Sequence, residues 1–165
     1  MTIQISSYQI SDSSSVYGGE DVRVDITSRG TFRVNNLHVS FDPTTDAYPT
    51  GSFTMRLDLT DSLKAFVTST SIEQVNTHGF NTPTAIISGR CDVRQNDSEP
   101  GPLPVGCRFW MLLVDNEHPD LPHTSNNSPT PDIVSFIIYD REGSRIAYGT
   151  GPVVQGDIKI TPSTL

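Results

Sequence analysis

The feature that most constrains the fold is the density of β-branched and aromatic residues within residues 131–160. A polar turn at residues 140–143 interrupts this apolar run. Asp140 at the first turn position and Gly143 at the fourth suit a type I turn, with the glycine free to adopt a positive φ. We therefore predict a β-hairpin closed by this turn and, after it, a last strand over residues 153–160.

Short strands are also predicted along the rest of the chain. Residues 20–28 and 52–60 alternate apolar and polar side chains with the period of two that is typical of half-buried strands. A parity shift at residues 35–36 indicates a bulge or tight bend. Residues 63–75 are less regular, and one helical turn near their start is the alternative. The predicted strands are residues 2–10, 20–28, 31–41, 52–60, 63–75, 84–94 and 107–114, and the predicted loops are residues 11–19, 42–51, 76–82, 95–106, 115–131 and 149–152.

About nine or ten short strands and no convincing amphipathic helix indicate a single all-β domain over residues 1–165. Residues 107–114 and 133–139 are almost continuously apolar, which favours strands covered on both faces. That pattern predicts an antiparallel β-sandwich. The alternative is a closed β-barrel.

The balance of acidic and basic residues indicates which classes of binding partner to expect. The chain of 165 residues has 11 Lys and Arg against 19 Asp and Glu, a net charge of −8. Nucleic acid and anionic membrane surfaces require clustered cations, so we expect neither as a partner. No apolar run approaches the roughly 20 residues of a membrane-spanning helix. The N-terminus lacks the pattern of a signal peptide, so the protein stays inside the cell or its signal has been removed.

Two cysteines, Cys91 and Cys107, flank a proline-containing loop. If that loop joins two antiparallel strands, the cysteines can lie opposite each other, where a cross-strand disulfide is sterically possible. Two buried apolar thiols are the alternative. A closed zinc site would need further ligands.

The long loop at residues 115–131 is the first candidate site, because irregular segments of this length are often functional. Its oxygen-bearing side chains suit Ca²⁺, whereas its two histidines together with a carboxylate suit Zn²⁺. A solvated acidic loop is the alternative. The candidate metal ligands are Asp115, Asn116, Glu117 and Asp120 for Ca²⁺, and His118, Asp120 and His123 for Zn²⁺.

Trp110, Tyr139 and Tyr148 are a second candidate site, an aromatic platform for a sugar or a hydrophobic ligand. Packing in the core or at an edge is the alternative. The glycine-rich residues 149–152 resemble a phosphate-binding loop only superficially, because no helix follows them. Catalytic residues are not identified by the sequence.

Four short patterns resemble a C-terminal β-domain of bacterial surface and secreted proteins, the post-COAP type. They are a glycine-led strand, an apolar strand ending in Asp-Asn, a strand that closes on an Asp-X-X-Gly turn, and a glycine-led last strand, found here at residues 88–89, 108–116, 132–143 and 156–160. The resemblance covers roughly the C-terminal two-thirds of the chain. It implies an extracellular accessory or binding module without a catalytic role, and it transfers no site residue.

Three functions follow as hypotheses. The first is a non-catalytic module that binds a carbohydrate, a small molecule or a partner protein through residues 115–131 and 42–51, with Ca²⁺ ordering the former loop. The second is a small cofactor-free cyclase, isomerase or hydrolase with an Asp or His acid–base group in a cavity. The third is a structural subunit that assembles through strand edges. A filled core with a flat aromatic patch favours binding, and an enclosed pocket with an inward carboxylate favours an enzyme. A large apolar patch rimmed by polar residues favours assembly.

Overall fold

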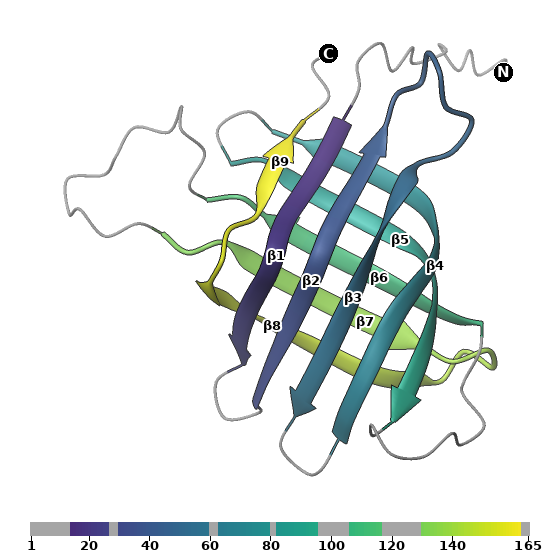
Figure 1. The fold of residues 1–165 in the computed structure, drawn as a ribbon, viewed down its shortest axis with the longest axis vertical. Helices are drawn as coiled ribbons and strands as arrows, with labels where there is room; N and C mark the ends of the chain where they lie inside the picture. Colours follow the sequence, from purple (N-terminus) through teal and green to yellow (C-terminus); the bar gives the residue numbers. More distant parts are fainter. Residues whose placement is uncertain are drawn as a thin grey trace, which may run out of the picture.

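The computed structural model describes residues 14–26, 30–59, 63–79, 82–95, 106–116 and 130–162. These residues form nine antiparallel strands, and β1 pairs with both β2 and β8, so that the first eight strands close into a barrel (Figure 1). The closed barrel, the alternative fold of the sequence analysis, is thereby confirmed. The strands are β1 (Ser14–Ile26), β2 (Gly30–Phe41), β3 (Thr50–Leu59), β4 (Leu63–His78), β5 (Thr84–Gln95), β6 (Cys107–Val114), β7 (Ile133–Tyr139), β8 (Arg145–Gln155) and β9 (Lys159–Thr161).

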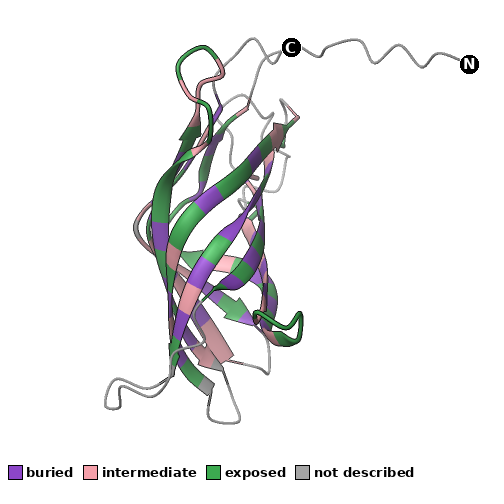
Figure 2. Cartoon of the chain, turned by 90° about the vertical axis from the view of Figure 1, so that its right-hand side faces the viewer, coloured by how far each residue is buried: buried purple, intermediate pink, exposed green. Residues whose placement is uncertain are grey.

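Apolar side chains fill the barrel. Buried and exposed residues alternate along the strands (Figure 2), as the period-two pattern predicts. An eight-stranded barrel is just wide enough for its inward side chains to pack. Two edge-to-face phenylalanine pairs, each with ring centroids 4.8 Å apart, join opposite walls: Phe32 with Phe136, and Phe53 with Phe109. The described inward side chains form one contiguous hydrophobic core.

The barrel is flattened, with β1–β3 lying in front of β5–β8 and crossing them steeply (Figure 1). Bulges allow the long strands to bend between the two halves. The predicted irregularity at residues 35–36 is confirmed, since the β2–β3 register shifts between Asn35 and His38 and Asn36 has a φ of 53°. At a β4 bulge, a Cβ on Gly89 would lie 2.1 Å from the carbonyl oxygen of Ser71. Glycine is therefore required where the backbones meet.

The predicted turn after β7 is confirmed. The Gly143 amide donates to the Asp140 carbonyl oxygen at 3.1 Å, and Gly143 has a φ of 87°. The Asp140 carboxylate also accepts the amides of Glu142 and Ser144. This network holds the β7–β8 hairpin.

The predicted break at residues 149–152 is wrong, because β8 runs through it. Gly149 and Gly151 face the interior, where a Cβ on Gly149 would lie 2.4 Å from Cδ1 of Ile26. A Cβ on Gly151 would lie 2.3 Å from the carbonyl oxygen of Asp25. These glycines permit the close approach of β1 and β8 that closes the barrel.

Three other boundaries also differ from the predictions. Residues 14–19, predicted as part of a loop, belong to β1, because Val16 is buried in the core and pairs with Val39 of β2. β4 extends to His78, beyond its predicted end, because its last residues pair with β5. The predicted last strand is split between the end of β8 and β9, with Gly156 between them at a φ of 88°. The strand predicted over residues 2–10 lies outside the described residues.

Two buried carboxylates hold β9 at one end of the barrel. The Asp132 carboxylate accepts the amide of Ile158 at 2.9 Å and that of Asn116 at 2.8 Å. The Asp115 carboxylate accepts the amide of Ile160 at 3.1 Å. β9 pairs with β1, so these carboxylates supply acceptors that a second neighbouring strand would otherwise provide.

Candidate functional site

The outer surface of β5–β8 carries an apolar face, which we define by Ile86, Trp110, Leu112, Ile137 and Tyr148. Trp110 on β6 lies opposite Ile137 on β7, which lies opposite Tyr148 on β8. Ile86 on β5 lies opposite Leu112 on β6 in the neighbouring row. Four of these five side chains belong to the large hydrophobic residues that remain exposed, at 39–43% of their surface. The apolar face therefore spans four adjacent strands.

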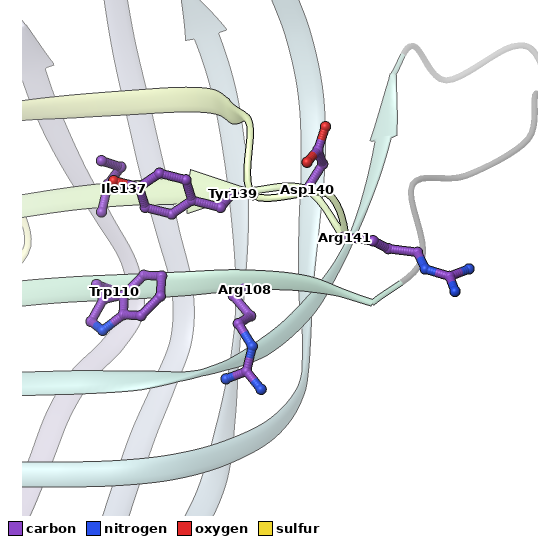
Figure 3. A pocket seen from close by; sticks show the side chains of 7 residues that line it. Arg108, Trp110, Ile137, Tyr139, Asp140 and Arg141 are labelled. Atoms are coloured by element: carbon purple, nitrogen blue, oxygen red, sulfur yellow. The ribbon is translucent and has the colours of Figure 1, made fainter.

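A shallow pocket of about 510 Å³ lies at one end of the apolar face. Figure 3 shows Trp110 and Arg108 on β6 beside Ile137 and Tyr139 on β7. The rings of Trp110 and Tyr139 meet edge to face, with centroids 5.4 Å apart. The β7–β8 turn completes the wall with Asp140, Arg141 and Gly143.

Arginines border the apolar face on the side of the β7–β8 turn. Arg90, Arg108 and Arg145 share one row with Tyr139 across the four strands. Glu73 of β4 pairs with Arg90 at 2.8 Å and with Arg108 at 3.0 Å. These contacts, above all the hydrogen bond from Arg90, hold the pKa of the Glu73 carboxyl below its ordinary value. The guanidinium of Arg145 lies 4.3 Å from the ring centroid of Tyr148.

The two arginines that line the pocket differ in their contacts. Arg141 forms no hydrogen bond or ion pair with any residue that the structure describes, and it is exposed. Figure 3 shows Arg108 beside Trp110 on β6, whereas the guanidinium of Arg141 points away from Trp110 and Tyr139 at the edge of the pocket. The pocket therefore combines apolar and aromatic surface with cationic hydrogen-bond donors, which suits a group that is apolar and bears a carboxylate.

The structure brings together the three aromatic residues that the sequence analysis named as a platform. Trp110, Tyr139 and Tyr148 lie on adjacent strands with their side chains on the outside of the barrel. Ligand binding by these residues stays a prediction. Ile86, Leu112 and Arg108 were missed as neighbours. Each lies directly between two buried residues on its strand, so alternation could have placed its side chain on the outside.

The expectation that β6 and β7 are covered on both faces is wrong. On β6, Phe109 and Met111 face the core, whereas Trp110 and Leu112 face outward and are exposed at 40% and 39%. The continuous apolar run therefore arises from a filled interior on one side and the apolar face on the other. A sequence pattern alone cannot separate this arrangement from a strand between two layers.

The candidate metal ligands fall largely outside the described residues, where Glu117, His118, Asp120 and His123 lie. Within the described ranges, no group of three or more His, Cys, Asp or Glu residues is arranged to hold a metal ion. Asp115 holds the backbone of β9, and the Asn116 side chain donates to the carbonyl oxygen of Pro131 at 2.8 Å. Metal binding by this loop stays a prediction.

Asp132 is the acidic group whose proton affinity the fold changes most clearly among the described carboxyls. Burial raises its pKa to about 6, and the nearby Asp115 and Asp157 act in the same direction. Backbone hydrogen bonds from Ile158 and Asn116 oppose this rise. A group that titrates near neutral pH can transfer protons. However, both oxygens of Asp132 already accept backbone amides, which indicates a structural role.

Comparison of the chain with protein-family models, with curated proteins and with solved structures gives no significant match. The resemblance to the post-COAP type stays a prediction. The residues that the structure describes include no helix long and apolar enough to cross a membrane.

Proposed function

We propose that the protein is a non-catalytic binding module that docks a partner protein on its apolar face. The observation that carries the proposal is the exposure of Ile86, Trp110, Leu112 and Tyr148 on adjacent strands of a barrel whose interior is filled by other side chains. Contiguous exposed apolar surface of this kind marks interaction sites in folded proteins. The proposed interface lies on the outer wall of the barrel over β5–β8, and the loops contribute less to binding.

The composition of the surface favours a protein over a sugar. Tryptophan, tyrosine and arginine dominate the energetic centres of protein interfaces. Aliphatic Ile86, Leu112 and Ile137 extend the aromatic surface. A sugar ring packs best on an open aromatic face, but one face of Tyr148 is occupied by Arg145, and Trp110 and Tyr139 do not form a common plane.

The expected partner segment is acidic and apolar. Arg108 and Arg141 lie beside the pocket and can each donate to a carboxylate. Leucine or aromatic side chains of the partner would cover Trp110 and Leu112. This charge pattern is local, because the chain as a whole carries a net charge of −8.

A peptide titration tests this chemistry. The probe is a fluorescein-labelled peptide of about ten residues that alternates leucine or tryptophan with aspartate, compared with the same peptide carrying lysine in place of aspartate. We expect the acidic peptide to bind with a Kd of about 10–100 μM and the basic peptide to bind at least tenfold more weakly. Trp110→Ala and Arg141→Glu should each weaken binding of the acidic peptide by about tenfold or more.

Tyr48→Ala is the matched control, because Tyr48 is an exposed aromatic residue on the loop between β2 and β3, away from the apolar face. It should leave the affinity unchanged. Loss of binding with Tyr48→Ala, but not with Trp110→Ala, would move the interface to that loop and overturn the proposal. Equal binding of both peptides, binding of an oligosaccharide panel at Trp110, or reversible dimerisation in sedimentation without peptide binding would also contradict it.

A further inference from the structure

Cys91 and Cys107 lie directly opposite each other in the pairing of β5 with β6. Both side chains are completely buried in the barrel interior. Opposed residues in antiparallel strands have Cα atoms about 4.5 or 5.5 Å apart, depending on their position in the ladder. Disulfides form across Cα separations of about 4.4–6.8 Å. Either position in the ladder therefore satisfies the distance that a bridge requires.

We propose that Cys91 and Cys107 are a covalent modification site, at which an intramolecular disulfide joins β5 to β6. The oxidant is a small disulfide such as oxidised glutathione. Each cysteine thiol loses its proton, and one S–S bond forms between the two sulfur atoms. The two electrons and two protons pass to the oxidant, whose own S–S bond breaks to give two thiols. The proposal is independent of the apolar face and of its partner.

The location of the pair decides when the bond can form. Burial raises the pKa of the Cys91 thiol to about 12, and the neighbouring Cys107 adds to this effect. Burial also raises the pKa of Cys107, with contributions from Asp140 and Asp92. Because the thiolate is the reactive form, oxidation of the closed barrel should be slow. The bond forms while β5 and β6 are paired but still open to the oxidant, during folding or transient opening.

The neighbouring residues favour intramolecular pairing. Immediately next to the cysteines, Arg90 and Arg108 are also directly opposed, and Glu73 holds both of their guanidinium groups on the outer face. This triad links β4, β5 and β6 on the outer face directly beside the thiols. The bridge would close a segment of fifteen intervening residues and restrict the unfolded chain. A stable structural bridge of this kind belongs to an oxidising compartment.

The test is refolding of the denatured, reduced protein in two buffers, one containing reduced and oxidised glutathione and the other only a reductant. The product is denatured, treated with N-ethylmaleimide and weighed by mass spectrometry. We expect the glutathione sample to contain a monomer without maleimide adducts, and the reduced sample to contain two adducts. Non-reducing digestion should link the peptides that contain Cys91 and Cys107. The bridged protein should melt about 5–10 °C higher than the reduced protein.

Cys91→Ala treated in the same way is the control, because it has only Cys107 and should show no internal link and no rise in the melting midpoint. If refolding fails, the native protein is incubated with oxidised glutathione under partly denaturing conditions, and the linked peptides are sought directly. Two fully alkylated thiols after equilibration with the oxidant would overturn the proposal. Disulfide-linked dimers as the sole oxidised product, or a bridge that lowers the melting midpoint, would also overturn it.

Discussion

The two walls of the barrel have similar interiors but different exteriors. The outer surface of β1–β3 carries an arginine row, Arg23, Arg33 and Arg56, in directly opposed positions on adjacent strands. Asp21 pairs with Arg33 at 2.6 Å and Asp58 with Arg56 at 3.2 Å, so carboxylates compensate two of the three charges. The outer surface of β5–β8 instead carries the apolar face.

This difference separates the side chains that the folded core requires from those that it does not require. Both walls bury apolar residues at the inward positions, and packing explains them. The paired charges on the outer surface of β1–β3 are usual for a protein surface that faces solvent. The outer surface of β5–β8 exposes tryptophan, leucine, isoleucine and tyrosine side chains to water. This exposure costs free energy, and packing of the interior does not explain it. The proposed interface would account for that cost.

The largest expected effect contrasts the two sides of β6. Phe109→Ala removes a fully buried ring that packs against Phe53, and it should destabilise the barrel by about 3–5 kcal/mol. Trp110→Ala on the outer side of the same strand should cost only about 1 kcal/mol. Urea denaturation of both variants measures the difference. Equal losses would mean that Trp110 is a structural residue, which would weaken the interface proposal.

An intermediate effect is expected from Asp132 and depends on pH. The pKa of Asp132 rises from 3.8 to about 6 on folding, so the folded protein binds this proton more tightly than the unfolded chain. Its contribution to stability is therefore fully present below about pH 4 and is lost as the pH rises through about 6. The wild type should gain roughly 2–3 kcal/mol relative to Asp132→Asn between pH 8 and pH 4.

Denaturation of both proteins across this pH range isolates the titration of Asp132, because the other carboxyl groups are common to the two. A constant difference between wild type and variant would show that Asp132 does not titrate in this range. A gain at high pH would mean that the hydrogen bonds from Ile158 and Asn116 outweigh burial and the nearby Asp115 and Asp157.

The smallest effect is expected in the arginine row. Arg23 lies opposite Arg33, and its shielded Nε has no acceptor among the described residues. Directly opposed like charges are unfavourable. Arg23→Gln should therefore change the free energy of unfolding by less than about 0.5 kcal/mol, in the stabilising direction at low salt. Arg33→Gln instead loses the ion pair with Asp21. Thermal melts at low and high salt measure both, and a large loss with Arg23→Gln would indicate an unrecognised partner.

The sequence predicted the all-β class, with the barrel as the alternative to a sandwich, and the β7–β8 hairpin, because these depend on local alternation and turn chemistry. The opposition of Cys91 to Cys107 was one of two alternatives, because it depends on the register of strands that a long loop joins. The loop predicted at residues 149–152 was wrong, because Gly149 and Gly151 allow close contacts with Ile26 and Asp25 on the distant β1. Long-range contacts of this kind leave no local pattern.

The candidate site was predicted only in part for the same reason. Trp110, Tyr139 and Tyr148 were named from their residue types, but the register of four strands decides that Ile86 and Leu112 join them. The same register decides that Asp115 and Asp132, on different segments, both hold β9. The alternation of apolar and polar residues predicts the face of the strand on which a side chain lies. The side chains that lie beside it on that face depend on how the strands pair.

The most direct test of the proposed interface is to map the acidic apolar peptide on the barrel by NMR. The account predicts that backbone and side-chain shifts concentrate at Trp110, Leu112, Ile137 and Tyr148, while Arg23, Arg33 and Arg56 stay unchanged. Shifts confined to the arginine row would show that the peptide recognises charge alone. That result would contradict the assignment of the apolar face as the binding surface.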